Sequence, residues 1–419
     1  MDTVIEGRFF IDGRIKETAV GIEDGKIAAV GNIVRGGDER IDFGEKLILP
    51  GFVDPHVHFR DPGLTKKEDF STGTMSALFG GYTCVLDMPN TVPPVTDLRR
   101  LREKKDEIRS KANIDYGLFA ALTPECDAEA LAPEVCGFKL FMGSTTGNIL
   151  MNDDGDIYSA MCKVARTGKV TSVHAEDDSM ILGNPEKNNW DHLKNRPLEA
   201  EHNAIRRLGR YKGMKINICH ITDAESLDLA KSFGFTAEVT AHHLFFCAED
   251  RTTAETKTNP PVRNRDVRDG LVNAFKDGKV PMFGSDHAPH TYIEKSGDYE
   301  SAPGGIPSVE TNVPLFMNLV KHGTLPLGLV AKMFSETPSE TFGINKGRIA
   351  KGYDADFAVF DMRDIRTINY EKLHSRAGYS PYDGMEAVFP SHVFVRGEMQ
   401  MEDGEYCGSK IGRDINAGN

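Results

Sequence analysis

Two histidines separated by a single residue, His56 and His58, follow the apolar run Leu47-Ile-Leu49. If that run continues as a β-strand, the two-residue period of a strand points both imidazoles to the same side. Both rings can then bind one metal ion, because neutral imidazole is a common metal ligand. For an isolated pair, two buried histidines that are only hydrogen-bonded in a core would be an equally good interpretation.

The pair is not isolated, because four more residues suited to a metal site stand at or near the ends of later apolar runs. They are Lys139, His174, His220 and Asp286. Their recurrence at equivalent positions predicts that they meet the two histidines in one site. Four imidazoles and a carboxylate favour a borderline divalent ion such as zinc, with manganese or cobalt as alternatives.

Lys139 is the unusual member of this set, since a bare ammonium group would repel cations. Two ions about 3.5 to 4 Å apart need an anionic bridging ligand and leave a shared hydroxide between them. Carbamylation of Lys139 by carbon dioxide would supply such an anion. The alternative is a lysine that lines the interior of a barrel and pairs with a carboxylate.

Apolar strands alternate with amphipathic helices between residues 51 and 346, which predicts an α/β fold. The candidate strands are 47–59, 82–88, 114–120, 135–142, 170–174, 215–220, 235–240 and 280–286, and the clearest helices are 98–108, 197–208 and 224–233. Eight units of this kind predict a (β/α)8 TIM-like barrel. In such a barrel the functional residues lie at the C-terminal ends of the strands.

Both ends of the chain show a different sequence pattern, in which short strands of alternating apolar and polar residues are separated by turn signals. Asp12-Gly13 and Asp24-Gly25 are hairpin signals, and similar segments follow residue 347. Short strand sets at the two termini need partners for their edges. We therefore expect one composite β-sandwich domain from residues 1–50 plus 347–419, beside a barrel domain of residues 51–346.

The composition restricts the class of partner and the compartment. The chain has 419 residues and a net charge of −13, which disfavours nucleic acid. Its N-terminus shows no export signal, and no apolar run approaches the roughly 18 residues of a membrane span. Seven scattered cysteines without a Cys-x-x-Cys pair indicate reduced thiols, so we expect a cytoplasmic protein. Alternation predicts that Cys219 points away from His220, into the core.

Six segments carry a resemblance to a known family. They are Asp-Pro-His-Val-His-Phe-Arg-Asp-Pro-Gly (54–63), Met-Pro-Asn-Thr (88–91), Phe-Lys-Leu-Phe-Met (138–142), His-Ala-Glu-Asp (174–177), Asn-Pro-Pro-Val-Arg (259–263) and Ser-Asp-His-Ala-Pro-His (285–290). With them the chain resembles the dihydroorotases of the amidohydrolase superfamily over both the barrel and the β domain. The resemblance implies reversible cyclisation of N-carbamoyl-L-aspartate to L-dihydroorotate in pyrimidine biosynthesis.

The resemblance also implies two zinc ions per subunit. His56, His58 and Asp286 would hold the first, His174 and His220 would hold the second, and carbamylated Lys139 would bridge them. Asp286 would in addition be the catalytic proton shuttle. Some dihydroorotases use an aspartate of an Asp-Asp-Gly segment as the bridge, and Asp153 in Asn-Asp-Asp-Gly is such a rival. Lys139 is preferred because it lies within an apolar run, whereas Asp153 lies in a polar, turn-like stretch.

Four residues are candidates for binding the substrate, which carries a carboxylate beside a cyclic amide. Arg60, two residues after His58, offers a guanidinium fork for the carboxylate. Asn90 and His290 could add donors, and Asn259 could pair with the amide edge of the ring. His242 and His243 are expected to support the site without binding metal, and His287 to orient Asp286 or pack under the polar loop 291–305, whose backbone could contact the substrate.

Two alternatives remain open on the sequence. A hydantoinase, dihydropyrimidinase or allantoinase would share the barrel, the metals and the lysine, although Arg60 argues against a neutral cyclic diamide because a buried guanidinium without an anion is costly. A catalytically silent scaffold would be expected to have lost metal ligands, and the set is complete. The resemblance finally suggests a homodimer and an association with aspartate transcarbamoylase.

Overall fold

The computed structural model describes residues 1–145, 147, 149–250 and 253–416. Its centre is an eight-stranded sheet in which each strand pairs in parallel with the next along the chain. The strands are β5 (Phe52–Val57), β6 (Tyr82–Asp87), β7 (Asp115–Ala121), β8 (Gly137–Phe141), β9 (Val170–His174), β10 (Ile216–Ile218), β11 (Thr236–Val239) and β12 (Met282–Phe283). A parallel bridge between Val57 and His287 closes the ring.

The sequence of these strands fits a sheet that is covered on both faces. Every residue of β6 and β7 is buried, and neither strand alternates between apolar and polar residues. Near-continuous apolar runs are typical of parallel strands with helices outside and packed side chains inside. The predicted (β/α)8 barrel is therefore confirmed.

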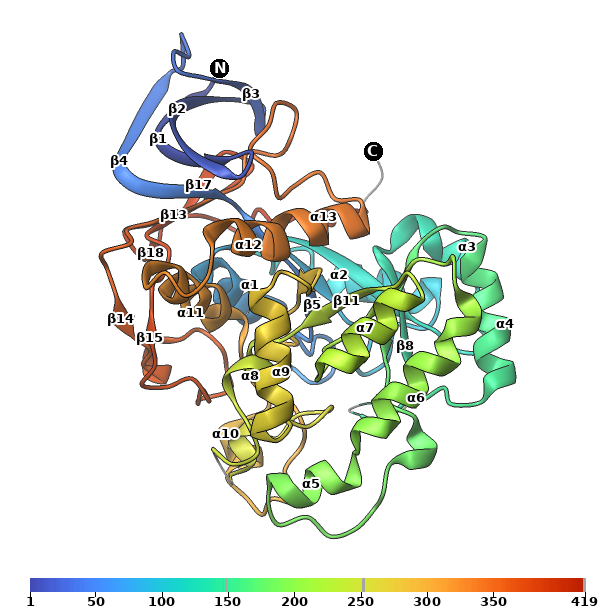
Figure 1. Ribbon diagram of the computed structural model, residues 1–419. Coiled ribbons are helices and arrows are strands. Elements are labelled where there is room, and N and C mark those ends of the chain that lie inside the picture. Colours follow the sequence, from blue (N-terminus) through green and yellow to red (C-terminus); the bar gives the residue numbers. More distant parts are fainter. Residues whose placement is uncertain (146, 148, 251–252, 417–419) are drawn as a thin grey trace.

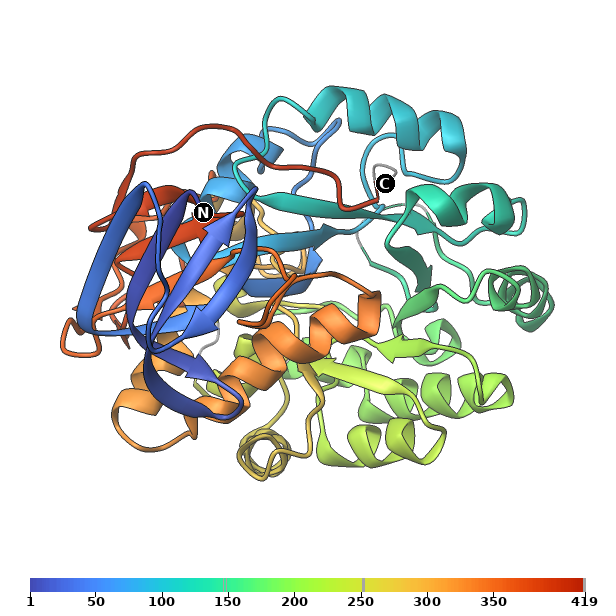
Figure 2. The ribbon, with the colours of Figure 1, turned by 90° about the horizontal axis from the view of Figure 1, so that it is seen from above.

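Helices connect the strands and pack around the outside of the barrel (Figures 1 and 2). The longer ones are α1 (Phe70–Phe79), α2 (Leu98–Ile108), α4 (Asp154–Ala165), α6 (Leu198–Leu208), α7 (Ala224–Ser232), α9 (Arg265–Lys276) and α11 (Val309–Lys321). The shorter ones are α3 (Ala128–Leu131), α5 (Asn189–Asn195), α8 (Ala241–Phe245), α10 (Tyr292–Lys295), α12 (Leu327–Ala331) and α13 (Thr337–Phe342). Helix α2 shows the pattern: its N-cap Asp97 accepts from the backbone N–H of Arg100, and Leu101 and Ile108 face inward.

A second eight-stranded sheet combines the two ends of the chain, as predicted (Figure 2). Its N-terminal strands are β1 (Thr3–Ile11), β2 (Arg14–Glu23), β3 (Lys26–Gly31) and β4 (Glu39–Pro50), and its C-terminal strands are β13 (Phe357–Phe360), β16 (His392–Val395), β17 (Glu398–Glu402) and β18 (Glu405–Tyr406). Strand β13 pairs antiparallel with β4 and so joins the two sets. Phe9, Phe357 and Phe394 pack in the core of this sheet.

One sequence expectation is wrong at the junction of the two sheets. The run Leu47-Ile-Leu49 belongs to β4 of the composite sheet, where it pairs with β13, and the barrel strand begins only at Phe52. Gly51 lies between them, and a Cβ atom there would come within 2.3 Å of Oγ1 of Thr83. The chain therefore passes from one sheet to the other at a glycine, and an apolar run cannot show such a break.

Part of the C-terminal segment packs on the barrel rather than on the composite sheet. Strands β14 (Arg366–Thr367) and β15 (Glu386–Ala387) form a two-stranded sheet, and the N–H of Val388 donates to the carbonyl of Pro314 in α11 at 3.0 Å. The hydroxyl of Ser375 donates to Glu68 at 2.5 Å, just before α1. The boundaries 1–50 plus 347–419 and 51–346 stay a prediction.

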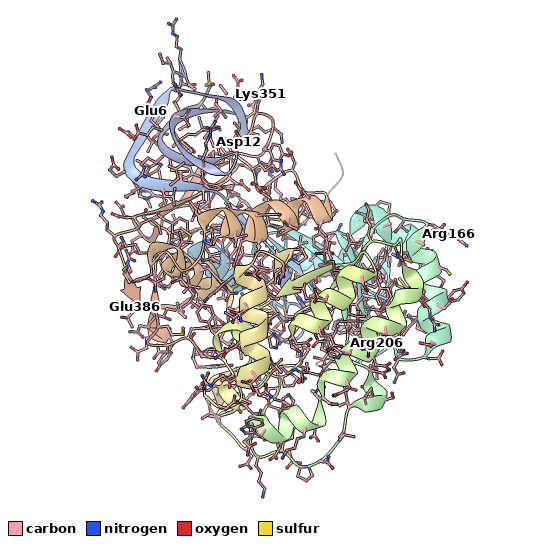
Figure 3. All side chains as sticks on the ribbon, in the orientation of Figure 1. Glu6, Asp12, Arg166, Arg206, Lys351 and Glu386 are labelled. Carbon is pink, nitrogen blue, oxygen red and sulfur yellow. The ribbon has the colours of Figure 1, made fainter. Side chains whose placement is uncertain are left out.

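Many charged side chains project from the outer surface, among them Arg166 and Arg206 (Figure 3). In the part of the chain that the structure describes, no helix is long and apolar enough to cross a membrane.

Candidate metal centre

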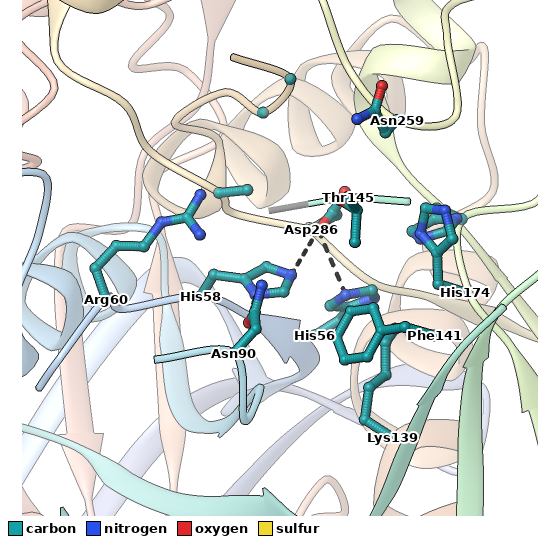
Figure 4. Close-up of a pocket in the computed structure, with 14 residues that line it drawn as sticks. His56, His58, Arg60, Asn90, Lys139, Phe141, Thr145, His174, Asn259 and Asp286 are labelled. Carbon is teal, nitrogen blue, oxygen red and sulfur yellow. Dashed lines mark hydrogen bonds and ion pairs between the residues drawn. The ribbon is translucent and has the colours of Figure 1, made fainter. Parts of the chain in front are cut away.

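A pocket opens where the barrel strands end, and most of the predicted site residues line it (Figure 4). Its lining comprises His56, His58, Arg60, Asn90, Lys139, Phe141, Thr145, His174, His220, Asn259, Asp286, Ala288, Gly304 and Gly305. His290 is the one predicted residue that does not line it, although His290 contacts Arg60 from behind. The structure thus brings together residues from β5, β8, β9 and the loops after β6, β10 and β12.

Three residues at the pocket have left-handed backbone conformations that L-residues other than glycine seldom adopt. The φ angles are 63° at Arg60, 39° at His220 and 45° at Asp286. Such conformations cost about 1–3 kcal/mol each and persist where the surrounding structure enforces them, often at functional sites. Here the sharp turns after β5, β10 and β12 direct these side chains into the pocket.

His56, His58 and Asp286 form one group of ligand atoms. Oδ1 of Asp286 lies 3.1 Å from Nε2 of His58 and 3.4 Å from Nε2 of His56 (Figure 4). Two donors bound to one tetrahedral zinc ion at about 2.0–2.1 Å lie about 3.3 Å apart. The group therefore has the spacing of ligands that share one ion.

His174 and His220 form a second pair on the other side of Lys139. Nδ1 of His174 lies 3.1 Å from Nε2 of His220, which again matches two ligands of one ion. Nδ1 of His220 is buried and has no hydrogen-bond partner among the described residues. Burial lowers the pKa of both imidazoles, and of His56 and His58 as well, so the four rings are neutral and offer lone pairs.

In His56, His58 and His174, the ring nitrogen that faces away from the pocket is held by an acceptor. Glu238, at the end of β11, contacts Nδ1 of His56, and Asn90 Oδ1 accepts from Nδ1 of His58 at 2.6 Å. Glu176 lies 2.8 Å from Nε2 of His174. Each contact fixes a tautomer and aims the other nitrogen at the pocket, as the partners of metal-binding histidines do.

Glu176 and Glu238 were missed as functional residues in the sequence. Glu176 stands two residues after His174, and Glu238 near the end of a predicted strand, so spacing could have found both. Burial opposes ionisation of Glu176, but Arg196 and His174 outweigh it and lower its pKa to about 2. Burial of Glu238 is likewise outweighed by His56, which lowers the pKa of that carboxyl.

Lys139 is buried between the two groups, and its ammonium has no carboxylate partner among the described residues. Nζ donates to Sγ of Cys219 at 2.9 Å and lies 5.3 Å from the centre of the Phe141 ring. The expectation that Cys219 points away from the site is wrong, because the chain turns sharply at His220 and alternation ends there. Asp153 is exposed at the N-cap of α4 and does not line the pocket.

Arg60 forms the polar side of the pocket that faces away from His174 (Figure 4), and His290 contacts Arg60 from outside the lining. The Arg60 side chain is 2% exposed, its Nε donates to the carbonyl of Pro289 at 3.2 Å, and no carboxylate lies within ion-pair distance among the described residues. Burial lowers the pKa of the Arg60 guanidinium to about 10. It stays charged at neutral pH, so the pocket contains a buried cation without a paired anion.

Asn259 is oriented by a histidine that the sequence did not single out. Nε2 of His192 lies 3.0 Å from Oδ1 of Asn259, and Nδ1 of His192 lies 2.8 Å from Oε1 of Glu186. A Cβ at Gly304 would come within 2.9 Å of the Asn259 amide nitrogen, so only glycine permits this approach. The side-chain oxygen of Asn259 thus contacts His192, and the amide N–H groups of Asn259 remain available to donate into the pocket.

The other histidines play supporting parts. His243 lies in α8, where its Nδ1 is 2.8 Å from the N-cap hydroxyl of Thr240. His287 accepts through Nδ1 from the backbone N–H of Ser308 at 3.0 Å, so it packs under the loop that leads into α11. His242 is buried, and neither of its ring nitrogens has a partner among the described residues. None of the three lines the pocket.

Comparisons with known proteins agree over nearly the whole chain. The amidohydrolase family model matches residues 47–399. The dihydroorotase of Methanosarcina mazei is 35% identical, with 94% of this chain and 92% of that protein covered, and the dihydroorotase of Pyrococcus furiosus is 36% identical, with 99% and 96% covered. Among solved structures, the L-hydantoinase (dihydropyrimidinase) of Arthrobacter aurescens is 27% identical over 99% of both chains with a TM-score of 0.92.

Proposed function

Because the chain belongs to the amidohydrolase family, we propose that it acts as a dihydroorotase, an enzyme that opens and closes a cyclic amide. The reaction interconverts N-carbamoyl-L-aspartate and L-dihydroorotate, a step of pyrimidine biosynthesis. Curated dihydroorotases about 35% identical over nearly their full length support this assignment. The substrate is then a small molecule with a carboxylate next to the ring amide.

One observation carries the choice of a carboxylate substrate: the buried, unpaired Arg60 guanidinium in the pocket. A buried charge without a counter-ion is strongly destabilising, and a bound carboxylate offsets that cost. A neutral ring such as hydantoin would leave the guanidinium desolvated and unpaired. The fold shared with hydantoinases makes hydantoin hydrolysis the second candidate function.

The donor set fits two divalent metal ions. Ligand atoms of His56, His58 and Asp286 lie together, as do Nδ1 of His174 and Nε2 of His220, and the neutral imidazoles suit cations rather than protons. We assign one zinc ion to each group. When bound, the ions supply an activated water and polarise the amide carbonyl.

Lys139 lies between the groups and is the proposed bridge, as a carbamate. An uncharged amine reacts with carbon dioxide, forming an N–C bond and releasing a proton, and the product is an anion with two oxygens. The buried position of Nζ without a carboxylate partner supports this role over a structural ion pair. The exposed N-cap position of Asp153 argues against the rival bridge.

The remaining residues bind the substrate and move a proton. Arg60 and His290 would hold the carboxylate, and Asn90 and Asn259 would bind the ring through their amide groups. Asp286 is the carboxylate of the lining and is proposed to accept a proton from the attacking water and deliver it to the leaving ring nitrogen. In ring closure the same carboxyl would take the proton from the ureido nitrogen.

Turnover of L-dihydroorotate, hydantoin and allantoin on one sample, with its zinc content measured, tests the assignment. We expect efficient turnover of L-dihydroorotate, with two zinc ions per chain, and weak or no turnover of the two neutral rings. A preference for hydantoin would instead support the second candidate. If metal-loaded protein turned over none of the three compounds, the result would support the alternative of a catalytically silent scaffold.

Three further expectations accompany this proposal. The resemblance to dihydroorotases supports a homodimer and an association with aspartate transcarbamoylase, and sedimentation of the protein alone and mixed with that enzyme tests both. A cytoplasmic location is supported by the cysteine usage. The described cysteines are all free, which is consistent with reduced thiols.

A further inference from the structure

A lysine outside the predicted site, Lys67, contacts the back of the substrate-binding side of the pocket. Its Nζ lies 2.9 Å from Nδ1 of His290 and 2.9 Å from Oε1 of Glu294 in α10. The Lys67 side chain is 18% exposed. Glu294 belongs to the capping box of α10, so it holds the ammonium in place. Lys67 therefore contacts the ring nitrogen of His290 that does not face Arg60.

This contact decides which nitrogen of His290 carries the proton. An ammonium group has three donors and no acceptor, so Nδ1 of His290 must accept. Burial, followed by the charges of Arg60, Lys67 and Lys295, lowers the pKa of His290 far below its usual value, so the ring is neutral. A neutral imidazole that accepts at Nδ1 carries its hydrogen at Nε2. His290 is thus held as an Nε2–H donor.

The consequence appears on the pocket side of the ring. Nε2 of His290 lies 3.3 Å from Nη2 of Arg60 and 3.1 Å from the carbonyl oxygen of Gly304. The Nε2–H donates to Gly304, so Nε2 offers no lone pair to Arg60. The Nη2–H of Arg60 is therefore not used by His290 and stays available to an anionic acceptor in the pocket. In the opposite tautomer, Nε2 would accept from Nη2 of Arg60, and that N–H would no longer be available to a substrate.

We propose that Lys67 is a positioning residue that fixes the tautomer of His290 and thereby makes the pocket selective for cyclic amides bearing a carboxylate. The inference rests on the proposed function, and it adds a residue that does not itself line the pocket. Lys67 acts through His290, and its loss affects binding of the carboxylate more than the chemical step. Glu294 contributes by orienting Lys67.

Steady-state kinetics of Lys67→Met with L-dihydroorotate test this role. Losing one charge-assisted donor should raise KM about tenfold or more and change kcat by less than about threefold. Lys67→Arg keeps a donor-only cation and should bring KM back to within about threefold of wild type. Lys66→Met is the matched control, because the adjacent Lys66 is exposed, and it should behave as wild type.

A double mutant separates this role from a merely structural one. With His290→Ala in place, adding Lys67→Met should raise KM no further, because the two residues act as one unit. Zinc content and melting temperature should match those of Lys66→Met. If Lys67→Met is unstable, Lys67→Gln provides the same comparison with a smaller change and should raise KM in the same direction.

The outcomes distinguish this inference from the proposed function. Wild-type protein with two zinc ions that does not turn over L-dihydroorotate would contradict the proposed function itself. An active wild type with a Lys67→Met KM raised by less than about tenfold, or with kcat reduced as much as KM is raised, would overturn only the role of Lys67. Additive effects of Lys67→Met and His290→Ala would overturn it as well.

Discussion

Oδ1 of Asp286 lies 3.1 Å from Nε2 of His58, although 228 positions separate the two residues in the chain. The parallel bridge between Val57 and His287 creates this proximity, because it joins the first and last barrel strands directly beside both side chains. Barrel closure therefore also brings Asp286 beside His56 and His58.

Asp286→Asn tests whether this carboxylate moves the proton. The variant should retain much of its zinc, since His56, His58 and the bridge remain, and it should lose about 10²-fold or more of the rate in both directions. Zinc analysis and assays of hydrolysis and cyclisation measure this. The exposed Asp154→Asn serves as control. A fully metal-loaded variant that keeps more than about a tenth of the wild-type rate would exclude the shuttle role.

Lys139→Ala tests the bridge. Without the carbamate, both zinc content and activity should fall, and short carboxylic acids such as acetate should restore part of each because they supply an anion in the vacated space. Lys212→Ala, at an exposed position, should leave both unchanged. A crystal structure with an unmodified Lys139 amine beside two zinc ions would contradict the proposal, as would acid-independent activity of the variant.

Arg60→Met tests whether the Arg60 guanidinium binds the substrate carboxylate. Removing a buried, charge-assisted contact should lower kcat/KM for L-dihydroorotate by more than about tenfold while zinc content stays at the wild-type level. Arg99→Met on the exposed side of α2 is the control. A loss smaller than tenfold, or a loss of zinc as large as the loss of activity, would place the carboxylate elsewhere.

The barrel, and the meeting of the six candidate metal ligands at one pocket, could be predicted from the sequence because both depend on local pattern. Apolar runs mark the strands, and a residue such as His174 at the end of a run is directed to the common mouth by the architecture itself. The start of the first barrel strand could not be placed from the sequence. Leu47 and Phe52 lie in one apolar stretch, but Leu47 belongs to a strand of the composite sheet and Phe52 begins the barrel strand.

The residues that support the site were harder to find, because their roles depend on contacts between distant segments. Glu238 meets His56 across 182 positions, and Lys67 meets His290 across 223. Glu238 has its place near the end of a predicted strand as a signal, but Lys67 carries no local signal that separates it from an ordinary surface charge. The direction of Cys219 was mistaken for a related reason: alternation assumes extended backbone, and His220 departs from it with a φ of 39°.

Lys295 connects two walls of the pocket and leads to a prediction about pH. Its buried Nζ donates to the carbonyls of Lys257, Pro303 and Gly305 at 3.0, 2.9 and 3.0 Å, and so joins the chain before Asn259 to the glycines that line the pocket. Burial, aided by the charge of Lys257, lowers the pKa of Lys295 to about 7. The same amine in the unfolded chain has a pKa of about 10.4.

Lys295→Met should therefore destabilise the protein by an amount that grows with pH. Between pH 7 and about 10 the unfolded wild type binds more protons at this residue than the folded wild type, so its free energy of unfolding rises with pH through that window, whereas the variant lacks this contribution. The variant also loses buried hydrogen bonds at both pH values, three where the amine is protonated and two where it is neutral, at a cost of about 0.5–1.5 kcal/mol each. Thermal or urea unfolding of both proteins at pH 6.5 and pH 9, with the exposed Lys321→Met as control, measures the difference. An equal loss of stability at the two pH values would show that Lys295 does not titrate within this window.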